Sequence, residues 1–134
     1  MSTIAGGCYC GAVRYESTGR VLRWVNCHCP DCRKLSGATF ASVIVVEASG
    51  FRLVSGENDL ETFQSSPGKL RFFCRICGSH VLAKFEAKPE ILLIRAGSVD
   101  GDPGVRPNAH IWVSHKAPWL DILDDIPRHQ EGLS

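Results

Sequence analysis

The sequence predicts a mainly β fold, and three observations lead to this class. Many short runs are rich in β-branched and aromatic residues, which favour strands. Gly, Pro, Asn or Asp separates most of these runs, as turns require. No long stretch carries the apolar spacing of an amphipathic helix. With 134 residues the chain has the length of one domain, so we expect residues 1–134 to form a single domain.

The N-terminal part is predicted to contain two strands. Residues 12–17 alternate apolar and polar side chains, a turn is expected at residues 18–19, and residues 21–26 again favour a strand. Before them, Cys8 and Cys10 could both reach one ion if the chain is extended there. Alternate residues of an extended chain point to the same side, so both sulfur atoms would face one ion.

The middle of the chain is predicted to be almost entirely strand. Residues 34–37 indicate one short helical turn that ends at Gly37. Residues 39–46 are β-branched and apolar, which is typical of a central strand buried on both faces. Further strands are expected at residues 51–54, 60–64, 70–73, 80–85, 91–95 and 110–113.

Towards the C-terminus the sequence predicts a long loop and then a short helix. Residues 97–108 contain Gly, Pro and Asp in an irregular order, and long ordered loops are often functional. Apolar residues recur at near-helical spacing in residues 118–126, so this segment is expected to form a helix packed through Trp119, Leu123 and Ile126.

The charge balance does not favour nucleic acid or an anionic membrane as a partner. The formal net charge is +1, and acidic residues are interspersed among the basic ones along the chain. The longest apolar run, residues 41–46, is far shorter than a membrane span, and residues 1–7 lack the pattern of a secretory signal. We therefore expect a cytoplasmic protein, in which clustered cysteines bind metal or act in catalysis rather than form disulfides.

The seven cysteines fall into three clusters, Cys8 with Cys10, Cys27 with Cys29 and Cys32, and Cys74 with Cys77. The first and third clusters together supply four thiolates, the number found in closed structural zinc sites. We call them the four-cysteine group. The second cluster, the three-cysteine group, would leave one position of a zinc ion open, as catalytic sites do. The alternative partition joins the third cluster to Cys27 and Cys29. It is less favoured, because it leaves Cys8, Cys10 and Cys32 to be accounted for.

Three other interpretations of the three-cysteine group stay open. Cys29 and Cys32 have the spacing of a redox-active dithiol. The group could also be a second structural site, closed by His28 or His80 as a fourth ligand. Lastly, both sites could exist only to fold a small binding module. His28 would point away from its cysteine neighbours in an extended chain, so we expect it to be a hydrogen-bonding neighbour rather than a ligand.

With these clusters in place, the chain resembles the glutathione-dependent formaldehyde-activating enzyme family, also called the S-(hydroxymethyl)glutathione synthase family. The segments that carry the resemblance are residues 7–11, 27–37, 73–80 and 107–112, with Lys116, Pro118 and Trp119. They extend over nearly the whole chain. No separate motif can be assigned to the glutathione tripeptide.

The resemblance implies a β-tent fold, in which antiparallel sheets are pinned by zinc. It implies two Zn²⁺ ions, a structural one on Cys8, Cys10, Cys74 and Cys77 and a catalytic one on Cys27, Cys29 and Cys32. The implied reaction joins the thiol of glutathione to formaldehyde, or splits the product, as a carbon–sulfur lyase does. The partners would then be a small-molecule thiol and aldehyde. The alternative is a non-enzymatic zinc-binding module that binds a protein partner.

Several polar residues next to the clusters are candidates for a supporting role. Arg33 and Lys34 follow the last cysteine of the three-cysteine group and could meet a substrate carboxylate. Four more residues could line a pocket, namely Ser79, His80, His110 and Trp112. The sequence does not determine the oligomeric state.

Overall fold

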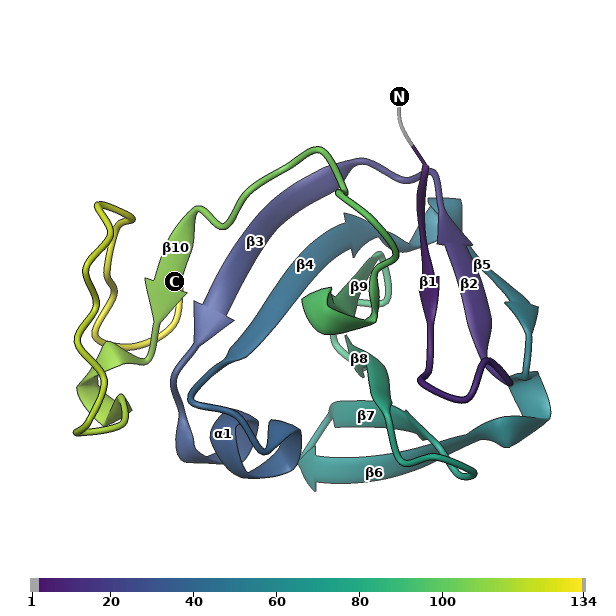
Figure 1. The fold of residues 1–134 in the computed structure, drawn as a ribbon, viewed down its shortest axis with the longest axis horizontal. Helices are drawn as coiled ribbons and strands as arrows, with labels where there is room; N and C mark the ends of the chain where they lie inside the picture. Colours follow the sequence, from purple (N-terminus) through teal and green to yellow (C-terminus); the bar gives the residue numbers. More distant parts are fainter. Residues whose placement is uncertain (1–2, 134) are drawn as a thin grey trace.

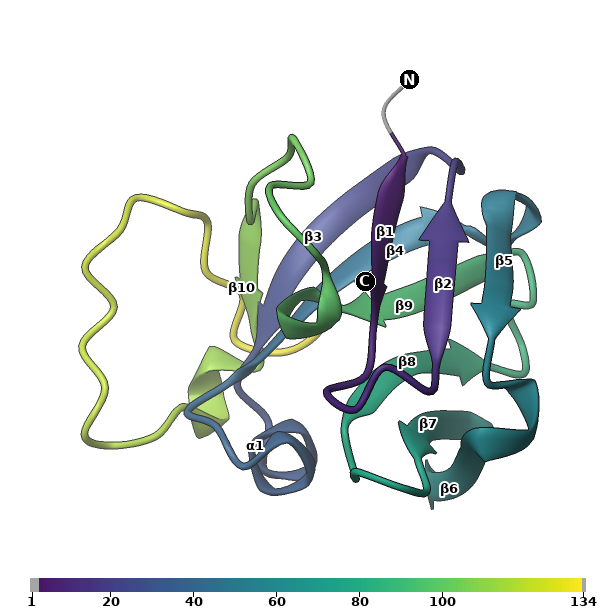
Figure 2. The ribbon, with the colours of Figure 1, turned by 45° about the vertical axis from the view of Figure 1, so that its right-hand side comes forward.

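The structure is a computed structural model that describes residues 3–133. Its smaller sheet has three antiparallel strands in the order β1-β2-β5. These are β1 (Ile4–Gly7), β2 (Arg14–Ser17) and β5 (Phe51–Ser55). Figure 2 shows this sheet lying in front of the larger one. The N-terminal strand β1 was not predicted, since its two glycines disfavour a strand.

The larger sheet has seven strands in the order β10-β3-β4-β9-β8-β7-β6, and it curves through the molecule in Figure 1. Its strands are β3 (Val21–Cys27), β4 (Ala41–Glu47), β6 (Leu60–Ser66), β7 (Lys69–Cys74), β8 (His80–Phe85), β9 (Ile91–Arg95) and β10 (Ala109–Ile111). All neighbours pair antiparallel except β10 and β3. The mainly β prediction is therefore confirmed, with one parallel pair that it did not include.

The helices are short, and all but the last lie between two strands along the chain. The α-helix is α1 (Pro30–Ser36), and the 3-10 turns are η1 (Ala48–Gly50), η2 (Glu57–Asp59), η3 (Ala96–Ser98) and η4 (Val113–His115). Among residues 3–133, no helix is long and apolar enough to cross a membrane.

Strand β4 lies at the centre of the larger sheet and is buried on both faces, as predicted. Ile44 and Val46 point to one face and pack with Tyr15 of the smaller sheet and with Val13, which directly precedes β2. This first core holds the two sheets together, because it removes apolar side chains of both from water. Val43 points to the opposite face. That face is not covered by the smaller sheet and forms the floor of the cavity described below.

The predicted helix over residues 118–126 is wrong. No helix forms there, and Trp119 and Leu123 are 71% and 91% exposed. The chain instead runs back along β10, where the backbone N–H of His110 donates to the carbonyl of Pro127 and the N–H of His129 donates to the carbonyl of His110. These long-range backbone hydrogen bonds attach residues 127–129, directly after this segment, to β10.

Two local predictions around the cysteines also need correction. Cys8 and Cys10 lie in a turn rather than an extended segment, with the N–H of Gly11 donating to the carbonyl of Cys8 at 3.2 Å. The helical turn expected at residues 34–37 is the end of α1, which begins at Pro30. Proline is well suited to the first turn of a helix, because its missing N–H would have no partner there.

Candidate metal centres and the cavity beside them

The four-cysteine group joins the two sheets. Cys8 and Cys10 lie on the loop between β1 and β2, Cys74 is the last residue of β7, and Cys77 lies in the turn before β8. Their four sulfur atoms all lie within 4.8 Å of one another. The group therefore connects the N-terminal hairpin of the smaller sheet to a hairpin of the larger one.

Backbone and hydroxyl groups hold the four-cysteine group in shape. The N–H of Gly78, a residue with a φ of +82°, donates to the carbonyl of Cys74 and closes the turn. The Ser79 hydroxyl accepts from the N–H of Tyr9 at 3.0 Å and lies 3.2 Å from the sulfur of Cys77. This hydrogen bonding lowers the pKa of the Cys77 thiol to about 5, which favours the thiolate that a metal binds.

The three-cysteine group lies where β3 turns into α1. Cys27 is the last residue of β3, Cys29 is the N-cap of α1, and Cys32 is buried in its first turn. The sulfur of Cys29 accepts a hydrogen bond from the backbone N–H of Cys32 at 3.4 Å. The three sulfur atoms also lie within 4.8 Å of one another.

The spacing of the sulfur atoms fits a zinc ion in both groups. A tetrahedral zinc with Zn–S bonds of about 2.3 Å places its sulfur ligands about 3.8 Å apart. The measured separations are 3.6 Å between Cys8 and Cys10 and 3.8 Å between Cys10 and Cys74. Cys27 and Cys29 are 3.5 Å apart. Both groups therefore bring their sulfur atoms close enough to share one metal ion.

Negative charge in the three-cysteine group concentrates on Cys32. Hydrogen bonding with the thiols of Cys27 and Cys29 lowers the pKa of Cys32, and the nearby guanidinium of Arg71 adds to this. Both terminal nitrogens of Arg71 lie 3.9 Å from the Cys32 sulfur. The pKa of Cys27 is raised, first because its thiol is hydrogen-bonded to Cys29. A thiolate is thus favoured at Cys32 before any metal binds.

A cavity of about 540 Å³ opens beside the three-cysteine group, whose three residues all line it. Its floor is the second face of the larger sheet, with the apolar side chains Val25, Val43, Val45, Ala83 and Leu93. The cavity also has five basic side chains in its wall, Arg23, Lys69, Arg71, Lys88 and Arg95. The four-cysteine group does not line this cavity, whereas the three-cysteine group faces a space in which a small molecule fits.

The basic residues of the cavity were missed in the sequence, although two signals point to them. Arg95 ends a strand whose other residues, 91–94, are all apolar and buried. Lys69 and Arg71 alternate along β7, so both side chains point to one face. A charged residue in a buried strand requires a charged or polar partner, which makes such positions candidates for a binding site.

Of the polar and aromatic residues proposed from the sequence to line a pocket or meet a substrate, one lines this cavity. Trp112 lines the cavity as expected, whereas Arg33, Lys34, His80 and His110 do not. The ring of His80 stacks on Phe73 with 5.7 Å between the ring centres, and burial lowers its pKa. Neither His28 nor His80 belongs to the groups whose ligand atoms meet within 4.8 Å.

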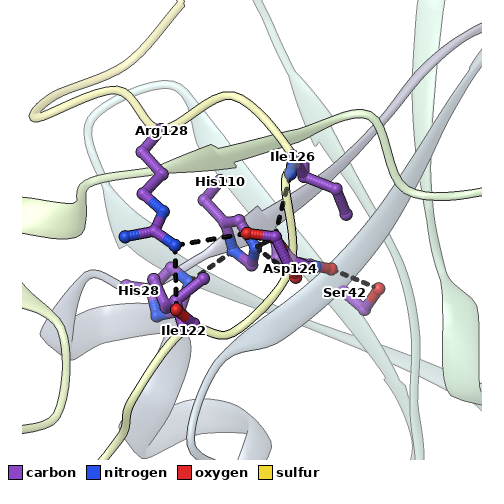
Figure 3. Close-up of polar contacts among 8 residues, drawn as sticks. His28, Ser42, His110, Ile122, Asp124, Ile126 and Arg128 are labelled. Carbon is purple, nitrogen blue, oxygen red and sulfur yellow. Dashed lines mark hydrogen bonds and ion pairs between the residues drawn. The ribbon is translucent and has the colours of Figure 1, made fainter.

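His28 takes part in a buried chain of hydrogen bonds, shown in Figure 3. Its Nε2 lies 2.9 Å from Nδ1 of His110, whose Nε2 lies 3.0 Å from a carboxylate oxygen of Asp124. When Nε2–H of His110 donates a hydrogen bond to this carboxylate, Nδ1 of His110 can accept a hydrogen bond from Nε2–H of His28. Burial lowers the pKa of His28 to about 4, which agrees with a neutral ring. The ring of His28 thus contacts His110, and it is not among the side chains that could hold the metal.

Replacing Asp124 with alanine is expected to lower the melting temperature. The substitution removes the acceptor of the buried His110, and it also removes the carboxylate that accepts from the N–H of Ile126. The tail beside β10 then loses part of its attachment. Asp125→Ala is the matched control, since Asp125 is exposed and makes no side-chain hydrogen bond among the described residues. Equal melting temperatures for the two variants, measured by circular dichroism, would contradict this role.

Comparison with known proteins gives a consistent result. A family model described as glutathione-dependent formaldehyde-activating enzyme matches residues 3–115. A Halomonas elongata protein with that provisional name is 27% identical over 127 residues, which are 89% of this chain and 80% of that protein. A Sordaria macrospora protein with the same provisional name is 31% identical over 85 residues, or 59% of this chain. This match spans only 36% of the Sordaria protein.

A solved structure is also similar. The crystal structure of a Rhodobacter sphaeroides protein matches with a TM-score of 0.60 and 27% sequence identity. The match covers 77% of this chain and 91% of that one.

Proposed function

Because the chain belongs to the glutathione-dependent formaldehyde-activating enzyme family, we propose that it is a zinc-dependent carbon–sulfur lyase acting on glutathione and formaldehyde. The observation that carries this proposal is the position of the three-cysteine group, which has three possible metal ligands at the wall of a cavity. The names of the family and of the relatives support the pair of substrates.

The proposed reaction forms one bond between sulfur and carbon. The thiol gives up its proton, the sulfur attacks the carbonyl carbon of the aldehyde, and the carbonyl electron pair moves to the oxygen. The oxygen then takes up a proton, so the product is a hemithioacetal, in which the sulfur carries a hydroxymethyl group. The reverse reaction splits this product, and neither direction consumes an oxidant or a reductant.

In this proposal Cys27, Cys29 and Cys32 would hold a zinc ion by three thiolates, and the ion would supply a positive charge beside the substrate sulfur. A free thiol is only a few per cent thiolate at pH 7, and bound zinc keeps a coordinated thiol deprotonated. The cavity beside this group has an apolar floor against which the reactants could pack. The chain thus acts mainly by positioning the two reactants.

The four-cysteine group has a different proposed role. Its zinc would be structural, since four thiolates leave no open position. By linking the smaller sheet to the larger one, it would hold residues 1–134 as one zinc-binding domain. We propose that the protein works in the cytoplasm, where the thiols stay reduced.

The proposed function can be tested by NMR with ¹³C-labelled formaldehyde and glutathione. Exchange of label between formaldehyde and its glutathione adduct should be faster with zinc-loaded protein than in buffer alone. An exchange rate equal to the spontaneous rate would contradict the enzyme and favour the alternative, a zinc-binding module without catalysis.

A further inference from the structure

Three cations lie beside the three-cysteine group without a carboxylate partner. They are Lys69, Arg71 and Arg95, and all three line the cavity. The residues Arg71 and Arg95 are only 4% and 7% exposed. Among residues 3–133, none of the three forms an ion pair with a carboxylate. Burial lowers the pKa of both Lys69 and Arg95, which reflects the cost of keeping a charge there.

The hydrogen-bonding capacity of these side chains is largely unused. Arg71 donates from Nε to the hydroxyl of Ser65 at 2.7 Å and from its two terminal nitrogens to the sulfur of Cys32 at 3.9 Å, which leaves two of its five N–H groups unused. Lys69 places its Nζ over the ring of Phe85, 4.1 Å from the ring centre. Arg95 makes no side-chain hydrogen bond to any described residue. A guanidinium has five N–H donors, so most donors in this part of the wall are free to bind a ligand.

The metal centre alone does not balance these charges. A divalent ion bound to three thiolates carries a net charge of about −1. The three cations then leave a surplus of two positive charges next to the cavity, and Arg23 and Lys88 add to the surplus. Asp31 is the acidic side chain in the cavity wall, and it is exposed on α1. The cavity is therefore built for a ligand with negative charge.

We propose that Lys69, Arg71 and Arg95 bind carboxylate groups of the substrate, so that this chain prefers thiols that carry carboxylates to neutral thiols. The inference rests on the proposed function, because it assumes that the substrate sulfur lies at the three-cysteine group. The terminal nitrogens of Arg71 lie 3.9 Å from the Cys32 sulfur. A short substrate whose sulfur lies at the three-cysteine group could therefore place its carboxylate within reach of Arg71. A guanidinium binds a carboxylate by two parallel hydrogen bonds, and apolar surroundings strengthen this contact.

A different role for the same cations predicts a different result. If they only offset the negative charge of the metal centre, their removal would weaken the binding of metal and of every thiol alike. If they bind carboxylates, their removal weakens only the binding of thiols that carry one. Two probes of nearly equal shape separate these roles, namely 3-mercaptopropionate and its neutral amide, 3-mercaptopropionamide.

The test is a calorimetric titration of zinc-loaded protein with each probe. We expect the carboxylate to bind at least about tenfold more tightly than the amide, as a charge-assisted hydrogen bond to a buried cation allows. High salt should reduce this difference. In Arg95→Gln the difference should become clearly smaller, with the affinity for the amide unchanged, because Lys69 and Arg71 remain. Lys69→Gln provides a second variant if Arg95→Gln does not fold. In Arg106→Gln, the matched control, the preference should persist, since Arg106 is exposed and pairs with Asp102.

The possible outcomes separate the inference from the proposed function. Equal affinity for the two probes in the unmodified protein would overturn the inference and leave the proposed function standing. An equal loss of affinity for both probes in Arg95→Gln would assign the cations to the metal centre and also overturn it. If neither probe binds, the three-cysteine group does not accept a thiol, and the proposed function fails together with the inference.

Discussion

Cys74→Ser is expected to unfold the protein or to lower its melting temperature by more than about 10 °C. Cys74 is fully buried at the end of β7, and its sulfur lies 3.8 Å from that of Cys10 on the N-terminal loop. Structural zinc contributes on the order of 10 kcal/mol to folding, because the unfolded chain has no formed site. Loss of one ligand therefore removes a large share of the stability and separates the two sheets.

The stability of this variant is measured by thermal unfolding, together with its zinc content. The matched control is Arg75→Ser, which introduces the same side chain at the next position of the same turn. Arg75 forms an exposed ion pair with Asp59, and such pairs contribute little to stability. An unchanged melting temperature in Cys74→Ser would disprove the assignment of a structural zinc to the four-cysteine group.

Cys29→Ser is expected to leave the fold intact and to abolish catalysis. The rate enhancement over the spontaneous reaction should fall by at least about 100-fold relative to the unmodified protein. Cys29 is the N-cap of α1, where its sulfur accepts from the N–H of Cys32. Serine is a good N-cap residue, so its hydroxyl preserves the start of the helix. It does not replace the thiolate, and two sulfur ligands hold zinc poorly.

The activity of this variant is measured by the ¹³C exchange experiment, and its fold by circular dichroism. We expect one zinc ion per chain in place of two, with a melting temperature within a few degrees of the unmodified protein. If Cys29→Ser unfolds instead, the three-cysteine group is a second structural site. Full activity in a folded Cys29→Ser would remove this group from the mechanism.

The sequence predicted those features that depend on short-range patterns. The strand that became β4 was recognised because Val43 to Val46 are buried on both faces and β-branched or apolar. The family was recognised from the cysteine spacings, and the family model confirms it. The grouping of the sulfur atoms in space is the one expected from ligand counts, while their roles stay a prediction.

Features that depend on long-range contacts were not predictable in the same way. Residues 118–126 have helical spacing, but no helix forms there, and the side chain of Asp124 instead contacts the ring of His110. No local signal reveals that His110 would meet His28, which lies 82 positions earlier in the chain. The cavity likewise arises only when β3, β7 and β9 lie in one curved sheet, so that Lys69, Arg71 and Arg95 meet beside the three-cysteine group.

The central claim, an open zinc centre that accepts a thiol, is tested most directly by elemental analysis of zinc. Protein purified without chelator is measured as prepared, then after brief chelation with and without glutathione. We predict two zinc ions per chain, one of which is lost to the chelator unless glutathione protects it. A single, tightly held zinc that glutathione does not affect would contradict the open centre and leave only the structural site.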